Sequence, residues 1–190
     1  MCEDEKKAFL EKNVWVTEKI RMEAEEIRLR LNSRLSIFLN LVTSLIVVLS
    51  TLDLCVTENK KIINFSLLSL MLSIIVVSLT LIVTNWNLEV SANNFKNSYL
   101  DLQELYLDAE DLELSSIKKK YNEILRKYDN HNNIDYIYFK FAQAPENENF
   151  SCKLGEKLIV YLTKIVPNSL IIVALGALIF FITYYAIIGI

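Results

Sequence analysis

The sequence predicts an all-α integral membrane protein: a two-helix transmembrane hairpin, long cytoplasmic helices and a C-terminal third transmembrane helix. Residues 62–84 form an uncharged run of 23 residues, and two further apolar runs cover 35–56 and 169–190. Each is long enough for a bilayer, since a helical crossing needs about 20 apolar residues. The 190 residues include only three glycines and two prolines. Few turns are therefore expected, which favours long helices.

These runs divide the chain into five regions. They are an N-terminal amphipathic cytoplasmic helix (1–34), the transmembrane hairpin (35–84), a cytoplasmic helical region (85–142), a linker (143–157), and an interfacial segment with the C-terminal transmembrane helix (158–190).

The first region carries an apolar stripe at helical spacing that includes Val14, Ala24, Ile27 and Leu31. Eight acidic and eight basic side chains fill its other faces. They form either a solvated surface or a docking face for a later helix. No glycine or proline separates this helix from the first crossing, so we expect it to continue into the membrane.

The hairpin connection, residues 57–61, is too short to be a domain, so the two crossings must be antiparallel neighbours. Residues 1–34 hold eight Lys or Arg, the connection holds two, and ten follow the second crossing. The positive-inside rule then places the N-terminus and residues 86–157 in the cytoplasm and the C-terminus outside. A bacterial inner membrane is the expected location.

After the second crossing the helical pattern continues without an obvious break. Residues 88–128 predict one helix of about 60 Å, packed against the N-terminal helix or a neighbouring subunit. Residues 129–133 predict a turn. Residues 134–142 predict a short helix, because a lone strand would have no partner.

The C-terminal part begins with the polar linker. Residues 157–166 predict an interfacial helix on the inner leaflet. Pro167 is expected to end that helix, because proline lacks the backbone N–H of a helix interior. Asn168 then caps the last crossing.

No catalytic constellation is visible. The chain has one histidine and three scattered cysteines, and it lacks glycine-rich phosphate loops and G-x-S-x-G. We therefore expect no enzyme activity, no cofactor and no metal site. The net charge of −3 offers no electrostatic basis for direct nucleic-acid binding.

Polar side chains recur inside the membrane at four-three spacing. The first stripe is Ser36, Asn40, Thr43 and Ser50, and the second stripe is Ser66, Ser69, Ser73 and Thr80. Small polar residues allow close helix packing. In an oligomer they can also line a pore. Both interpretations stay open, and the lack of a charged ring predicts no sharp ion selectivity.

The order of a charged helix, two close crossings and a long helix ending in Tyr128-Asp129-Asn130-His131-Asn132-Asn133-Ile134-Asp135-Tyr136 resembles the SLATT family of bacteria. These are the SMODS and SLOG-associating two-TM effector domains. The likeness covers about residues 5–142. Asn130, His131, Asp135 and Tyr136 match, and the resemblance implies that they close the long helix against the N-terminal segment. The third crossing departs from the minimal pattern, although a subgroup associated with reverse transcriptases carries C-terminal extensions.

The resemblance implies an oligomeric effector of an antiviral or other conflict system. Such an effector permeabilises the membrane and arrests or kills the cell (abortive infection). The implied partners are lipid, further copies of the chain, and a component that supplies a nucleotide signal or contains a reverse transcriptase. Two alternatives are a membrane scaffold that recruits a soluble partner through its long cytoplasmic helix, and a holin-like protein.

Overall fold

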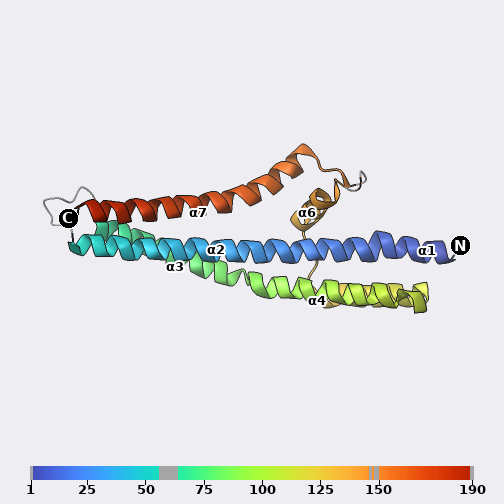
Figure 1. Ribbon diagram of the computed structural model, residues 1–190. Coiled ribbons are helices and arrows are strands. Elements are labelled where there is room, and N and C mark those ends of the chain that lie inside the picture. Colours follow the sequence, from blue (N-terminus) through green and yellow to red (C-terminus); the bar gives the residue numbers. More distant parts are fainter. Residues whose placement is uncertain (1, 56–63, 146, 148–149, 189–190) are drawn as a thin grey trace. The chain divides into compact units, whose positions relative to one another are not determined.

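The computed structural model describes residues 2–55, 64–145, 147 and 150–188, and every regular element there is helical (Figure 1). The all-α prediction is confirmed. The elements are α1 (Cys2–Phe9), a π-helical stretch η1 (Leu10–Trp15), α2 (Val16–Cys55), α3 (Phe65–Asn85), α4 (Leu88–Leu107), a 3-10 turn η3 (Asp108–Asp111), α5 (Leu114–Lys127), α6 (Asn133–Gln143) and α7 (Leu154–Ile188). The predicted hairpin connection, 57–61, lies outside the described residues.

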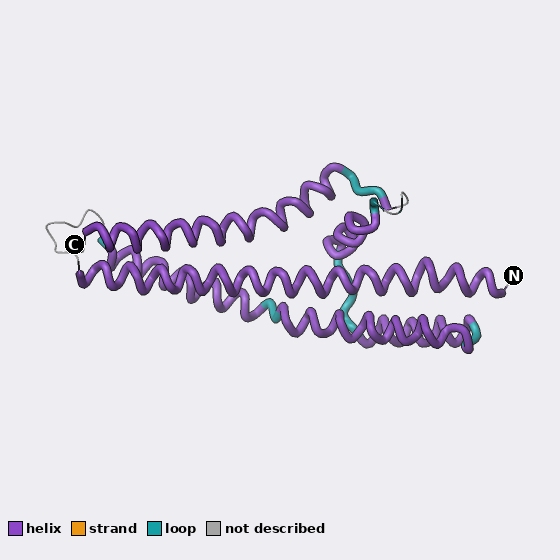
Figure 2. Tube along the Cα trace, in the orientation of Figure 1, coloured by secondary structure: helices purple, strands orange, loops and turns teal. Residues whose placement is uncertain are grey.

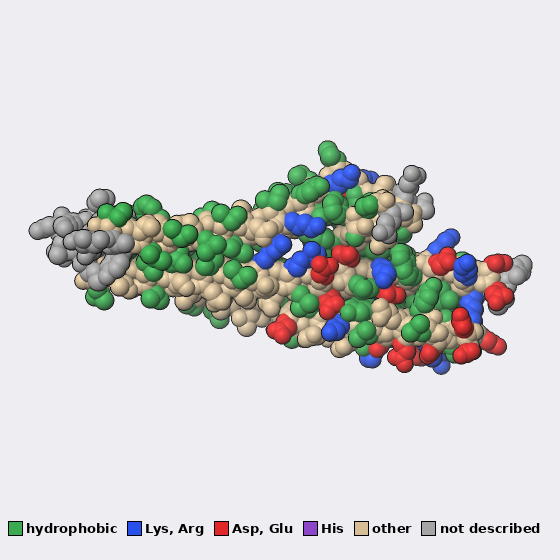
Figure 3. Space-filling model, in the orientation of Figure 1, with side chains coloured by type: hydrophobic (Ala, Val, Ile, Leu, Met, Phe, Trp, Pro, Cys, Tyr) green, Lys and Arg blue, Asp and Glu red, His purple; other side chains and the backbone are tan. Residues whose placement is uncertain are grey.

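The chain forms two compact units. We call Met1–Arg30 with Leu88–Tyr161 the polar unit, and Leu31–Asn87 with Leu162–Ile190 the membrane unit. On the face shown in Figure 3, charged side chains gather over the elements of the polar unit. Three helices, in α2, α3 and α7, are long and apolar enough to cross a membrane. The protein is therefore a membrane protein.

In the polar unit, α5 folds back along α4, so the predicted single helix over 88–128 is wrong (Figure 2). The chain turns at η3, and Leu112 and Glu113 are extended. Residues 108–113 include four carboxylates. Negative charge is unfavourable at the C-terminus of a helix and favourable at the N-terminus of the next, so this segment ends α4 and starts α5.

The core of the polar unit joins these two helices to the N-terminal segment. Val14 packs with Leu102, Leu105, Ala109 and Ile117, all buried. Across the same contact, Thr17 and Tyr121 share a hydrogen bond of 2.8 Å between their hydroxyls, and Gln103 Nε2 donates to Glu18 Oε1 at 3.0 Å. The acidic and basic faces of the N-terminal helix are therefore partly a docking face.

The boundaries of the second crossing also differ from the prediction. Asn64, predicted to lie within that crossing, instead caps α3, accepting a hydrogen bond from Leu67 N at 3.0 Å. At the other end, α3 does not continue into α4. Asn87 has a φ of 46°, a left-handed conformation that asparagine tolerates better than most residues.

The predicted short helix over 134–142 is confirmed as α6. The predicted linker is shorter than expected, because α7 already begins at Leu154. Glu156 explains this early start: its carboxylate accepts a hydrogen bond from Lys153 N at 2.9 Å and pairs with Lys140 of α6. The ion pair fastens the first turn of α7 to α6.

Pro167 does not end the helix predicted over 157–166, since α7 runs through it to Ile188, and Asn168 is not a cap. A proline inside a helix removes a hydrogen bond and displaces the preceding turn. In the membrane unit, Arg34 Nη1 donates to the Lys164 carbonyl in that turn at 3.4 Å. The carbonyl that would pair with the missing N–H of Pro167 is that of Thr163, four residues earlier, so the bond from Arg34 supports the same turn without replacing the one that proline removes.

The three crossings pack together inside the membrane unit. Leu45, Leu49 and Leu52 of α2 form a buried cluster with Phe65 of α3. Side chains of α7, among them Phe181 and Tyr184, lie against it. The Phe65 ring meets those two rings edge-on, at centroid distances of 6.2 Å and 6.0 Å. The third crossing is thus packed onto the hairpin.

Candidate functional site

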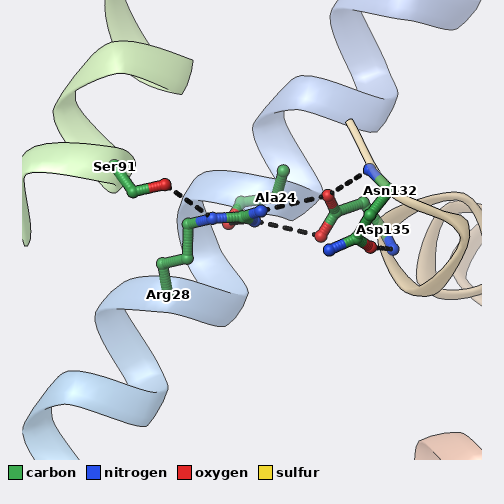
Figure 4. A network of polar contacts seen from close by, with 5 residues as sticks. All are labelled: Ala24, Arg28, Ser91, Asn132 and Asp135. Carbon is green, nitrogen blue, oxygen red and sulfur yellow. Dashed lines mark hydrogen bonds and ion pairs between the residues drawn. The ribbon is translucent and has the colours of Figure 1, made fainter. Parts of the chain in front are cut away.

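One polar network in the polar unit joins three helices, and we call it the Arg28 junction (Figure 4). Arg28 of α2 binds both carboxylate oxygens of Asp135 of α6, Nη1 to Oδ1 at 3.0 Å and Nη2 to Oδ2 at 3.2 Å. Its Nε donates to Ser91 Oγ of α4 at 3.0 Å, and Nη1 also donates to the Ala24 carbonyl at 2.7 Å. The guanidinium carbon lies 4.2 Å from the centre of the Phe95 ring.

The local sequence around Asp135 holds its carboxylate in position for the contact with Arg28. Asn132 and Asp135 form a reciprocal capping box at the start of α6: each backbone N–H donates to the other residue's side chain at 2.9 Å. This pairing fixes the rotamer of Asp135, whose side chain is only 2% exposed. A bidentate guanidinium–carboxylate contact at such a buried site is directional and among the stronger polar contacts.

The other residues of the family-like motif have different surroundings. Asn130 is exposed. Tyr136 stacks on Phe139 at 6.1 Å and lies 5.3 Å from Lys140 Nζ. His131 is partly buried, and its Nδ1 has no hydrogen-bond partner among the described residues. Of the four motif residues, Asp135 alone takes part in the Arg28 junction.

The surroundings of His131 predict that the folded chain loses stability in acid. Its pKa is lowered from the ordinary value of 6.5 by burial and then by the charge of Arg21, while Asp135 opposes the shift. The folded chain thus binds this proton less readily than the unfolded chain. Its contribution to stability is present above pH 6.5 and is lost as the pH falls toward the lowered pKa.

We therefore expect the Tm of the wild-type chain to fall on acidification below pH 6.5. The fall should be smaller in His131→Gln, which cannot take up this proton. Thermal unfolding followed by circular dichroism over that pH range measures the difference. Equal pH dependence in both proteins would contradict the prediction.

In the membrane unit, the first stripe faces away from the packed core. Ser36, Asn40, Thr43 and Ser50 are all exposed, and so is Val47 between them, at 63%. The buried residues of the same crossing are Val42, Leu45, Leu49 and Leu52. At 3.6 residues per turn, these lie on the opposite side of the helix from the stripe.

The side chains of the first stripe differ in how they are satisfied. Thr43 and Ser50 donate to carbonyls of their own helix, at 2.8 Å and 2.9 Å. These bonds remain within the helix. The Asn40 side chain, a carboxamide in an apolar crossing, has no hydrogen-bond partner among the described residues. The Ser36 hydroxyl has none either, but it lies at the start of the crossing, two residues after Arg34. Asn40 is therefore the unpartnered polar side chain that lies deeper in the crossing.

The second stripe has a different environment. Ser69 is buried and Ser73 partly buried, and Ser66 Oγ donates to Asp53 Oδ2 of the first crossing at 2.5 Å. Thr80 is exposed. In the single chain, most of this stripe therefore lies at contacts between helices. The two stripes are alike in sequence, but the first is exposed and most of the second lies between helices.

Comparison with known families gives one finding. The model of SMODS and SLOG-associating 2TM effector domain family 5 matches residues 3–183. The chain belongs to the SLATT family. The match includes most of α7, so the third crossing lies within the family domain of this SLATT chain. No curated protein and no solved structure gives a significant match. Membership makes the chain a membrane effector of conflict systems.

Sequence reasoning on this SLATT chain missed Arg28, Ser91 and Phe95. A signal was present for the first: Val14, Arg21, Arg28 and Leu35 recur every seven residues, so two arginines occupy positions on the apolar stripe. A charge on the buried face of a helix indicates a partner on another element.

Among the described residues, no group of three His, Cys, Asp or Glu has an arrangement that would hold a metal.

Proposed function

We propose that this SLATT protein is an oligomeric effector that forms or gates a pore in the bacterial inner membrane. A partner or a nucleotide signal triggers it, as part of an antiviral response that ends in abortive infection. The observation that carries the proposal is the outward-facing first stripe with its unpartnered Asn40. A carboxamide facing hydrocarbon is costly, whereas one facing another copy or a water-filled lumen is satisfied.

The polar unit is the element that would receive the trigger. Positive-inside reasoning puts it in the cytoplasm, where partners and nucleotide signals occur. Helix α2 carries both Arg28 and Asn40 without interruption. A change in the Arg28 junction would thus act on the same helix that presents the first stripe.

Membrane depolarisation in bacterial cells tests the proposal. Once triggered, induced wild-type protein should depolarise the membrane, as reported by a potential-sensitive dye. Asn40→Leu should reduce this depolarisation by about tenfold. That change corresponds to losing an interhelical hydrogen bond of about 1–2 kcal/mol. Ser78→Leu is the matched control, because Ser78 is exposed on α3 but belongs to neither stripe.

Two results would count against the proposal, the first against the role of Asn40 and the second against a pore. One is full depolarisation by Asn40→Leu at wild-type expression. The other is no depolarisation by the wild type under any trigger, which would favour the scaffold alternative. Val90, Leu100 and Leu107 of α4, which are 59%, 45% and 77% exposed, would then be the surface to examine for a soluble partner.

A further inference from the structure

Arg21 is a buried cation without a hydrogen-bond partner. The residue is 0% exposed, and its Nε, Nη1 and Nη2 bond to nothing among the described residues. Burial is the largest influence on its pKa, which it lowers. Arg28, seven residues along the same helix, uses all three nitrogens. An isolated charge in a dry interior is so unfavourable that a partner is expected.

The carboxylates nearest along the helix are already engaged. Glu18 accepts from Gln103 at 3.0 Å and pairs with Lys19 at 3.5 Å. Glu25 is hydrogen-bonded to the Tyr99 hydroxyl. The groups that act on the charge of Arg21 are the hydroxyls of Tyr121 and Tyr128, which are neutral at physiological pH. Its positive charge is therefore not neutralised within the described chain.

Two more buried polar atoms without partners belong to the same region. They are Ser98 Oγ of α4 and His131 Nδ1. Helices α2 and α4 run antiparallel, with Arg28 bonded to Ser91 and Glu18 bonded to Gln103. This register puts Ser98 level with Arg21. His131 senses the charge of Arg21 directly.

We propose that Arg21, Ser98 and His131 form a buried binding site for one small oxyanion. The guanidinium offers a planar fork of N–H donors, the geometry that suits the paired oxygens of a phosphoryl group or a carboxylate. The serine hydroxyl and the imidazole can each donate a further hydrogen bond. The three residues come from α2, α4 and the connection between α5 and α6, so a bound anion ties these elements together.

The unpaired atoms are closed to solvent. An anion therefore reaches them only through a local opening of the polar unit, and it is then held away from water. In such a place a charge-assisted hydrogen bond is stronger than at the surface. The site is independent of pore formation, and its test does not use membrane potential.

Thermal unfolding of the full chain in nanodiscs provides the first test. At matched ionic strength, sodium phosphate should raise the Tm above its value in sodium chloride, increasingly with concentration, as expected for a ligand of the folded state. Arg21→Met should be more stable than wild type in chloride and should not respond to phosphate. Arg126→Met, at an exposed arginine of α5, should keep the wild-type response.

Equilibrium dialysis with radiolabelled phosphate tests stoichiometry. We expect about one anion per wild-type chain, none in Arg21→Met, and about tenfold weaker binding in Arg21→Lys, which keeps the charge but loses the fork. A stronger response to acetate than to phosphate would assign a carboxylate ligand, and equal responses would show that the site accepts either oxyanion. A response to phosphate alone would assign a phosphoryl group.

Two outcomes would overturn the proposal. In the first, phosphate and acetate act on the wild type no differently from chloride, even if Arg21→Met is more stable. In the second, Arg21→Met and Arg126→Met respond to the anions equally. If Arg21→Met fails to fold, Arg21→Lys is compared with Arg126→Met in its place, and equal responses to the anions would again overturn the proposal.

Discussion

Replacing Arg28 by methionine is expected to lower the free energy of unfolding of the polar unit by about 3–5 kcal/mol. Asp135, whose side chain is 2% exposed, would be left as a buried charge without its cation. The cost is the uncompensated carboxylate more than the lost attraction. We expect the Tm of the full chain, measured by circular dichroism, to fall by more than about 10 °C.

Two controls separate this effect from a general loss of charge. Arg30→Met breaks the partly exposed pair with Glu26, at 3.4 Å on the same helix, and should cost at most about 1 kcal/mol. The double variant Arg28→Met/Asp135→Leu removes both buried charges and should recover part of the lost stability. A cost for Arg28→Met no larger than that for Arg30→Met would refute a stabilising junction.

Replacing Phe65 by alanine is expected to loosen the third crossing from the hairpin. Phe65 is fully buried and contacts the rings of Phe181 and Tyr184. A large-to-small change at such a site leaves a cavity and typically costs about 3–5 kcal/mol. We expect the lower end, about 3 kcal/mol, because the separated helices would be covered by lipid instead of water.

Unfolding of the full chain by sodium dodecyl sulfate in mixed micelles measures this cost. Phe180→Ala is the matched control: Phe180, on α7, also borders the aromatic cluster, but it is 59% exposed. It should change the unfolding midpoint little. Equal effects of the two substitutions would mean that the Phe65 contact does not hold α7 in place.

Residues 88–128 show where sequence pattern stops being informative. The apolar spacing of residues 88–128 is helical on both sides of residue 112, and the stripe shifts by one residue near that point. Such a shift fits either a drifting helix or two helices joined by a turn. The acidic segment 108–113 was the better indicator, because its charges disfavour one helix end and favour the next start.

Proline at position 167 was misleading for a related reason. Local rules predict a helix end there, because proline removes one backbone N–H. In an apolar segment, however, the remaining backbone groups are satisfied by continuing the helix or by polar groups of another element. Here Arg34, 130 residues away along the sequence, donates to the Lys164 carbonyl. Contacts between residues so far apart are invisible to a local pattern.

The sequence by itself determined that three helices cross the membrane, because insertion depends on the summed hydropathy of one continuous segment. It also determined the helical class and, through a short motif, the family. Only the tertiary structure decided the partners of the polar side chains. Ser69 and Asn40 look equivalent in a stripe, and Arg21 and Arg28 look equivalent on a helix. What distinguishes them is the neighbour that each one meets, or fails to meet, once the helices have packed.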